Sequence, residues 1–230
     1  GALLARERER WASEVWPWLL VAWLALTAGN GFGASWAYRT FGWGGFWAWD
    51  PVENTSLVPW LLAGASVHAL CLGAVRSRWL LNAAVCALGG FLSVLYGSFL
   101  ARSGMLKDAS VHAYVGGERL YLWALSALLL LGAAWALALL ILRWRSWGED
   151  GVAGRPAPEV LGWGVRMLAT MAAVVLGAMS VPMFGIAPST TAYNTLMMPF
   201  GVALVVLLAW PQHWSSPAHT RTVALILAAV

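Results

Sequence analysis

Long apolar stretches separated by short polar or charged segments dominate the chain. The nearly continuous apolar runs cover about 15–38, 52–75, 79–101, 120–142, 161–184 and 196–210, with a last run from near residue 221 to Val230. A helix needs about 20 apolar residues to cross a bilayer, and in lipid its backbone groups must be satisfied internally. We therefore expect an all-α, polytopic transmembrane helical bundle of about six spans plus a truncated seventh. Residues 1–230 would form a single membrane domain, part of a longer protein, in which the 196–210 helix is short.

The charged residues indicate how the bundle is oriented. Only 10% of the residues are charged, against about 25% in soluble domains. The net charge of +4 is carried by short arginine clusters between apolar runs, so we expect topology signals and no nucleic-acid partner. Ten of the 14 Lys and Arg residues fall on one set of alternate loops and four on the other. Because positive charge marks the cytoplasmic side, the segments 38–60 and 102–119 are predicted on the opposite side, which is periplasmic in a bacterium.

A dense cluster of tryptophans lies between the first two apolar runs, in the sequence WGGFWAWDPVENTSLVPW at 43–60. Trp43, Trp47 and Trp49 would form a flat apolar surface suited to a large planar ring. Asp50-Pro51 predicts the start of a helix, with Asp50 as N-cap and Pro51 at the first position, so that ligand carboxylates are favoured nearby. Tryptophan content alone also fits an interfacial aromatic belt, which is common where spans meet water.

The full string closely resembles the WWD signature of the haem-handling proteins of cytochrome c biogenesis. Its continuation through Glu53 and Asn54 resembles the CcmF type of that family, and the paralogue NrfE is nearly the same here. The resemblance is strong from about Trp36 to Tyr114. It implies that 38–60 is a periplasmic haem-binding segment in which the haem is held by Trp43, Trp47, Trp49, Asp50, Pro51, Glu53 and Asn54.

His68 lies inside the second apolar run, where a histidine needs a partner or a buried cofactor. Trp60, Gly64 and His68 recur every four residues, so they share one helix face, on which Gly64 would leave room beside the histidine. A hydrogen-bonded packing role is the alternative. The position after the motif resembles the intramembrane histidine that ligates a structural haem b in CcmF.

His112 lies in the 102–119 loop, on the predicted side of the motif. The run from Arg102-Ser103-Gly104 to His112 resembles the CcmF segment with a periplasmic ligand to the haem iron. A loop histidine without that resemblance is usually solvated or capping. Arg102 either pairs with a haem propionate or ends its span as a snorkelling anchor. His213 and His219 fall on the cytoplasmic side, where we expect no ligand role, so the second axial ligands would lie outside this chain.

The resemblance implies the membrane component of a cytochrome c haem lyase in the bacterial inner membrane. Such a protein takes substrate haem from the haem chaperone CcmE, and the CcmH/CcmI components deliver the apocytochrome c to which the haem is attached at CxxCH. No nucleophile or general base is identifiable, so enzyme activity rests on the resemblance. One alternative is a haem exporter or carrier of the CcmC type, without attachment chemistry. Another is a structural or transporter subunit whose tryptophans only form a belt.

Overall fold

The computed structural model describes residues 2–41, 46–73, 78–114, 119–148, 159–186 and 188–209, and every regular element in these ranges is helical. The helices are α1 (Ala2–Phe41), α2 (Asn54–Gly73), α3 (Arg78–Arg102), α4 (Arg119–Gly148), α5 (Glu159–Ser180), the short 3₁₀ helix η1 (Val181–Phe184) and α6 (Thr190–Ala209). Six of them are long and apolar enough to cross a membrane. The predicted all-α bundle with about six spans is confirmed, while the seventh run lies outside the described residues.

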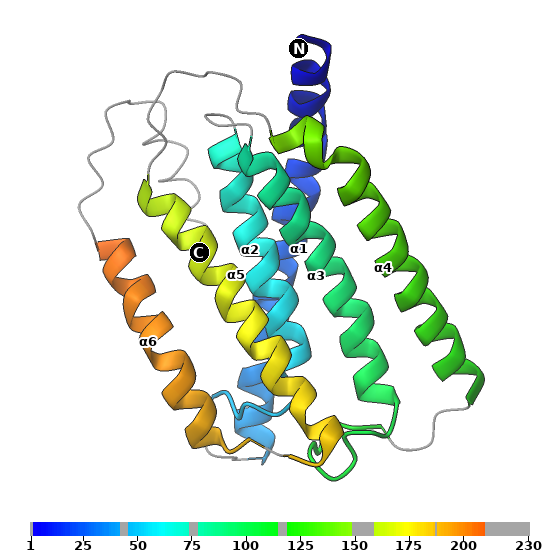
Figure 1. Cartoon of the computed structure of the whole chain (residues 1–230). Coiled ribbons are helices and arrows are strands. Elements are labelled where there is room, and N and C mark those ends of the chain that lie inside the picture. Colours follow the sequence, from blue (N-terminus) through cyan, green and yellow to red (C-terminus); the bar gives the residue numbers. More distant parts are fainter. Residues whose placement is uncertain are drawn as a thin grey trace.

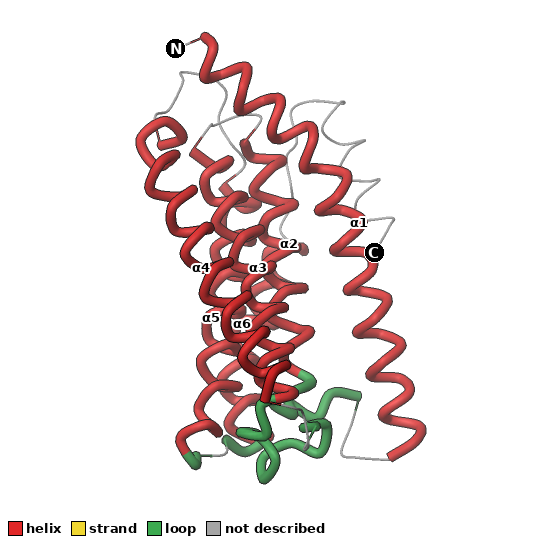
Figure 2. Tube along the Cα trace, turned by 90° about the vertical axis from the view of Figure 1, so that its right-hand side faces the viewer, coloured by secondary structure: helices red, strands yellow, loops and turns green. Residues whose placement is uncertain are grey.

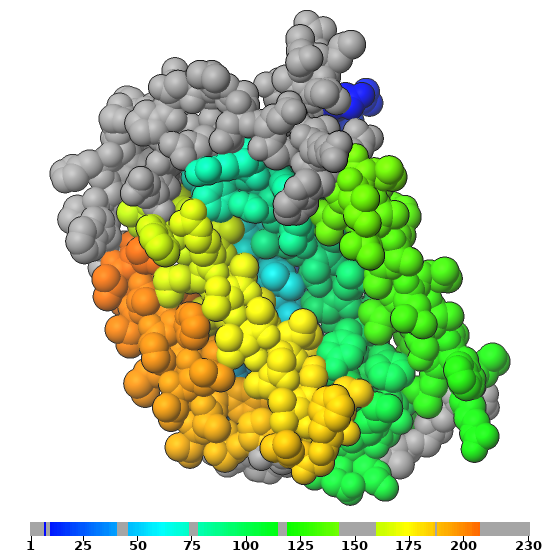
Figure 3. Space-filling model, viewed as in Figure 1, coloured from blue at the N-terminus to red at the C-terminus, as the bar shows by residue number. Residues whose placement is uncertain are grey.

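Helix α2 is the centre of the bundle. Most of its residues are buried, whereas few residues of α1, α4 and α6 are. It packs against α1, α3 and α5, while α4 packs on the outer side of α3 and α6 on the outer side of α5 (Figure 1). The space-filling view shows α5 and α6 across one face, with only a small part of α2 visible between α5 and α3 (Figure 3).

Small residues let α3 approach α2 closely. A Cβ atom added at Gly97 would lie 2.6 Å from the Thr55 Cβ, and one at Gly90 would lie 3.6 Å from the Leu62 Cβ. The buried Ser66 hydroxyl donates a hydrogen bond across the same interface to the Ala83 carbonyl oxygen, at 2.8 Å. The hydrophobic effect does not drive helices together in lipid. Small residues stabilise the contact instead, because they allow close van der Waals packing and hydrogen bonds between helices.

The helices differ from the predicted spans mainly at their ends. Helix α1 begins at Ala2 instead of near 15, and α4 continues to Gly148 instead of ending near 142. Apolar runs show which part of a helix lies in lipid, but the helix itself can continue beyond the lipid. The start of α1 is an example, because Arg10 and Glu14 form an ion pair on one helix face there.

The prediction that the sixth helix is short and starts near 196 was wrong, because α6 begins at Thr190. Its first turn is polar, and the Ser189 hydroxyl accepts a hydrogen bond from the Ala192 N–H at 3.1 Å, as an N-cap does.

The described loops that connect α1 to α2, α3 to α4 and α5 to α6 gather at one end of the bundle (Figure 2). We call residues 46–53 the motif loop, residues 103–114 the His112 loop, and this end of the bundle the motif end. The structure thus places the tryptophan motif and His112 at the same end, as the distribution of positive charge predicts.

Candidate functional site

The entry into α2 is fixed by two carboxylates that turn back toward the backbone. Asp50 Oδ1 accepts hydrogen bonds from the Val52 N–H at 2.8 Å and the Glu53 N–H at 3.2 Å. Glu53 Oε2 in turn accepts from the Ala48 N–H at 3.0 Å and the Asp50 N–H at 3.3 Å. This reciprocal arrangement is a capping box. The regular helix begins at Asn54, three residues later than Pro51, because the Thr55 and Ser56 N–H groups bond in a tighter i→i−3 turn.

The capping box changes the expected role of the helix N-terminus. The Val52 and Glu53 N–H groups, which a ligand carboxylate would use, are satisfied by Asp50. Burial raises the pKa of the Glu53 carboxyl above its ordinary value, and the Asp50 carboxylate adds to the shift. The N–H groups of Ala48 and Asp50, with His112 nearby, act in the opposite direction on that pKa.

Asn54 forms hydrogen bonds with Trp47 and Trp49, the two tryptophans of the motif that the structure describes. Its side chain is completely buried. Its Oδ1 accepts a hydrogen bond from the Trp47 indole Nε1 at 3.1 Å, and its Nδ2 donates to the Trp49 carbonyl oxygen at 3.2 Å. Both the oxygen and the nitrogen of the Asn54 amide are thus bonded to the motif loop.

Asp50 also joins the motif loop to the His112 loop. The Ser110 hydroxyl donates to Asp50 Oδ1 at 2.7 Å, and His112 Nδ1 lies 3.3 Å from the same oxygen. The Ser110 Oγ in turn accepts a hydrogen bond from the His112 backbone N–H at 3.1 Å, so that Asp50, Ser110 and His112 are all joined to one another. One carboxylate oxygen therefore serves both the helix cap and the loop that carries the histidine.

This contact orients the His112 ring. Because Nδ1 faces Asp50, Nε2 is the ring nitrogen that points away from the carboxylate, and the side chain is one-third exposed. Histidine ligands of metals commonly donate their other ring N–H to a carboxylate in this way. The arrangement suits ligation of an iron atom through Nε2.

Trp49 is held by the start of α6. Its ring stacks on Tyr193 with centroids 5.3 Å apart and planes 5° apart, and its Nε1 donates to Asn194 Oδ1 at 2.7 Å. Its backbone has φ 59°, in the left-handed region, which costs a residue with a bulky side chain about 1–2 kcal/mol. One indole face and the indole N–H are thus engaged by α6.

His68 lies in the middle of α2, and its Nδ1 is 2.7 Å from the Gly64 carbonyl oxygen. That bond places the proton on Nδ1 and leaves Nε2 as the basic nitrogen of the neutral ring. The Trp23 ring of α1 meets the His68 ring edge-on, with centroids 5.9 Å apart.

The expected space beside Gly64 is filled. Trp23 occupies it, since a Cβ at Gly64 would lie 3.0 Å from the Trp23 Nε1. The Trp23 ring also stacks on Trp60, with centroids 6.5 Å apart. Its indole nitrogen is buried and forms no hydrogen bond within the described residues. Sequence reasoning missed Trp23 because nothing in an apolar run indicates which residues of α1 face α2.

Two other candidates form none of these hydrogen bonds. Pro51 is a buried residue of the motif loop, and Arg102 ends α3 with an exposed side chain. No ion pair joins Arg102 to the motif loop among the described residues. Trp43, His213 and His219 lie outside the described residues. In the part of the chain that the structure describes, no group of three His, Cys, Asp or Glu side chains is arranged to hold a metal ion.

Sequence reasoning also missed three residues at the motif end: Ser110, Tyr193 and Asn194. The hydroxyl of Ser110 two residues before His112 was a usable signal, because such a side chain readily bonds to its own loop. The cap at Ser189 would have revealed the start of α6, although not its contact with Trp49.

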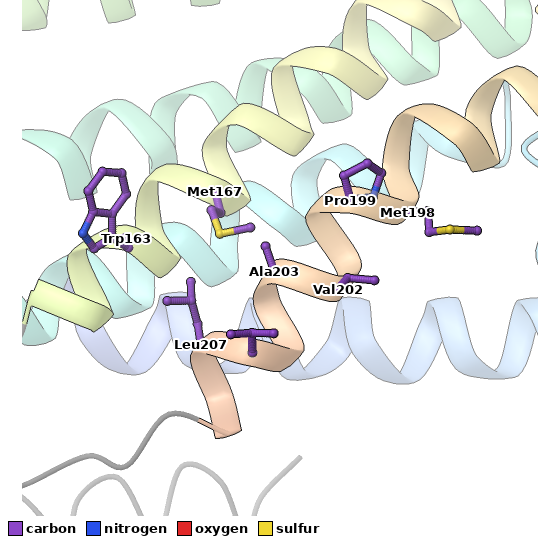
Figure 4. Close-up of a pocket in the computed structure, with 8 residues that line it drawn as sticks. Trp163, Met167, Met198, Pro199, Val202, Ala203 and Leu207 are labelled. Atoms are coloured by element: carbon purple, nitrogen blue, oxygen red, sulfur yellow. The ribbon is translucent and has the colours of Figure 1, made fainter.

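An apolar groove of about 620 Å³ lies between α5 and α6, away from the motif end. Its walls include Trp163 and Met167 on α5 and the stretch of α6 from Pro199 to Leu207 (Figure 4). Since the lining formed by the described residues is almost entirely apolar, the groove offers little polar surface with which to orient a ligand.

The chain is similar in sequence to known proteins. Residues 3–106 match the family model of the cytochrome C assembly protein. The cytochrome c-type biogenesis protein CcmF of Escherichia coli is 34% identical over 91% of this chain and 34% of its own length. The probable cytochrome c-type biogenesis protein NrfE of Escherichia coli is 35% identical over 84% of this chain and 36% of its own length. The cytochrome c-type biogenesis protein ccl1 of Rhodobacter capsulatus is 48% identical over 45% of this chain and 16% of its own length.

These matches define the class of protein: a multi-pass membrane protein of cytochrome c biogenesis. Within that class the chain is similar to both CcmF and NrfE over most of its own sequence, and these identities do not separate the two. The chain spans about a third of the length of the relatives that it matches over most of its own sequence. No solved structure matches it.

Proposed function

We propose that the motif end binds substrate haem for a cytochrome c haem lyase, with the Trp47 and Trp49 indoles as its platform and His112 as an axial ligand. The observation that carries this proposal is the shared Asp50 oxygen. It links the loop of the tryptophans to the loop of the histidine, and it directs His112 Nδ1 inward.

The tryptophans suit a planar ligand because their edges are fixed. Both indole N–H groups donate to asparagine side chains, Trp47 to Asn54 and Trp49 to Asn194. Rings anchored at an edge lose little further freedom when a flat ligand stacks on them, which lowers the entropic cost of binding.

The lyase reaction requires orientation more than acid–base chemistry. A cysteine thiol adds across a haem vinyl group: sulfur bonds to one vinyl carbon and the thiol hydrogen goes to the other, so the addition itself consumes no oxidant. Holding the vinyl groups beside a captured CxxCH pair makes that step effectively intramolecular. The role of this chain would be to hold the haem and exclude water on one face.

His68 is suited to a second, resident haem b. Its Nδ1 bond to Gly64 leaves Nε2 as the donor atom, and the unpaired Trp23 indole nitrogen lies in the same cluster. A bound haem b would relay electrons toward the substrate haem from an external donor and so help to keep it reduced. The chain's own contribution is to hold the histidine tautomer and to cover the site with Trp23.

The setting follows from the same proposal. The motif end would face the periplasm from the bacterial inner membrane, where CcmE supplies haem and CcmH/CcmI supply apocytochrome c. The distribution of Lys and Arg supports that orientation, with ten on the loops of the opposite end against four.

The test is cytochrome c maturation in cells whose only copy of the full-length protein carries His112→Ala. We expect maturation to be lost while the protein accumulates in the membrane, and Lys107→Ala, an exposed change in the same loop, to have no effect. Normal maturation with His112→Ala would refute the proposed ligand.

The haem content of the purified protein separates the lyase from its rivals. We expect a b-type spectrum that disappears with His68→Ala. Wild-type protein without haem would favour a carrier of the CcmC type. If the Trp47→Ala variant and the Asp50→Ala variant each support normal cytochrome c maturation, the tryptophans form only an interfacial belt and the proposed platform is refuted.

A further inference from the structure

The start of α6 lies at the motif end, next to the motif loop, although it follows that loop by more than 130 residues (Figure 1). Two consecutive α6 residues contact Trp49 in different ways. Tyr193 covers one face of the indole, and Asn194 accepts its N–H. Trp49 therefore has a partner both for its ring plane and for its edge.

From these contacts we infer that the N-terminal end of α6 is a third wall of the site, and that Tyr193 and Asn194 are positioning residues for Trp49. They hold the indole so that the face opposite Tyr193 receives the planar ligand. The ligand part of this inference rests on the proposed function, whereas the contact itself does not.

The backbone of Trp49 supports the inference. A tryptophan at φ 59° is in a conformation that L residues with large side chains avoid. Such a conformation persists only where the surroundings hold it. The Asn54 bond to the Trp49 carbonyl oxygen holds the backbone, and the α6 contacts hold the side chain.

Helix α6 is itself fixed where it makes these contacts. Ser189 caps its first turn, and Tyr193 is only 2% exposed. The Tyr193 hydroxyl is buried beside the Asn54 side chain and forms no hydrogen bond of normal geometry among the described residues. The ring of Tyr193, rather than its hydroxyl, therefore makes the contact with Trp49.

This distinction supplies matched variants. Asn194→Leu removes the acceptor at similar volume, and Asn194→Asp keeps an oxygen in its place. Tyr193→Leu removes the stacked ring, and Tyr193→Phe keeps it. Thr195→Val makes a polar-to-apolar change at the next, exposed position of α6.

The experiment is hydroxyl-radical footprinting of the full-length protein, with oxidation of Trp49 and Trp47 quantified by peptide mass spectrometry. Asn194→Leu and Tyr193→Leu should each raise the Trp49 oxidation rate by about fivefold, the population change expected when one such contact is lost. Asn194→Asp, Tyr193→Phe and Thr195→Val should leave the rate at the wild-type value.

Unchanged Trp49 oxidation in both leucine variants would overturn the inference. An equal rise at Trp47 would also overturn it, because that result indicates general loosening of the motif end.

Haem retention is measured on the same samples by gel filtration and absorbance. We expect it to fall in the two leucine variants and to recover in the conservative ones. Raised oxidation with unchanged retention would refute a role of Trp49 in ligand binding. Wild-type protein without haem at the motif end would refute the proposed function, while the oxidation rates would still decide whether α6 positions Trp49.

Discussion

Replacing Asp50 tests whether the two loops form one site. Asp50 Oδ1 accepts the Val52 and Glu53 N–H groups and the Ser110 hydroxyl, and it faces His112 Nδ1. Asp50→Ala removes all of these contacts. Asp50→Asn keeps an oxygen for the helix cap but loses the charge that strengthens the bonds to the His112 loop.

The loss of the helix cap and the loss of the bonds to the His112 loop differ in their energetic cost. Loss of an N-cap costs about 0.5–2 kcal/mol, and loss of a hydrogen bond to a charged group costs about 1.5–3 kcal/mol. We therefore expect Asp50→Ala to lower the free energy of unfolding by about 2–4 kcal/mol, since such terms do not add fully. For Asp50→Asn we expect a loss of about 1 kcal/mol, because the cap remains. A group that orients a metal ligand typically contributes about 10–100-fold to affinity, so haem binding should weaken by that factor in both variants.

The assay combines two measurements on purified full-length protein. Thermal unfolding in detergent reports stability, and a haem titration followed in the Soret band reports affinity. His112→Ala, titrated in parallel, isolates the part of the binding that belongs to the motif end. Asp108→Asn, an exposed carboxylate change in the His112 loop, is the control.

The decisive comparison is Asp50→Asn against wild type. Haem affinity that falls at least tenfold with little change in unfolding temperature supports orientation of His112 by Asp50. Affinity equal to wild type would refute the reasoning, because the contact between the loops would then be structural only.

Three further predictions concern packing and protonation. Gly97→Ala should lower the unfolding temperature, at a cost of about 1–3 kcal/mol, because the new Cβ would meet the Thr55 Cβ at 2.6 Å. The control is Gly89→Ala, where a Cβ would make only ordinary contacts. Equal stability of the two variants would contradict the prediction. Gly64→Ala should also destabilise, and Trp23→Phe should offset part of that loss in a double-mutant cycle, because the new Cβ would lie 3.0 Å from the Trp23 Nε1; strict additivity would argue against the contact. The pKa of Glu53 is raised in the folded protein above its ordinary value of about 4.5, so the free energy of unfolding should fall as the pH rises from that value through the raised pKa. Glu53→Gln should flatten this part of the pH profile of stability. An unchanged slope would show that another group is responsible.

The sequence was sufficient to predict about six spans and which loops share an end, although not the ends of every helix. Apolar length gives the spans, and the distribution of Lys and Arg gives the alternation of loops. From these, the tryptophan motif and His112 were expected on the same side of the membrane, as possible walls of one site. The capping role of Asp50 followed as well, because an Asp-Pro step with an acidic residue three positions later is a local signal.

The contacts between helices did not follow from sequence. In water, a helix shows its buried face by a polar opposite face, but lipid is as apolar as a protein core. Nothing in the 15–38 run therefore indicated that Trp23 faces His68. In the same way, the contact of Asn194 with Trp49 joins positions 145 residues apart, and a single sequence contains no signal for such a pair.

The separation between Trp49 and Asn194 also bears on biosynthesis. The ribosome releases the motif loop long before α6, and at about 5–20 residues per second the interval for 145 residues is roughly 7 to 30 s. During that interval the nascent chain has its tryptophans but not the helix that fixes one of them. The site is therefore completed only when α6 has entered the membrane, and a chain stopped before Asn194 would present an unfinished platform.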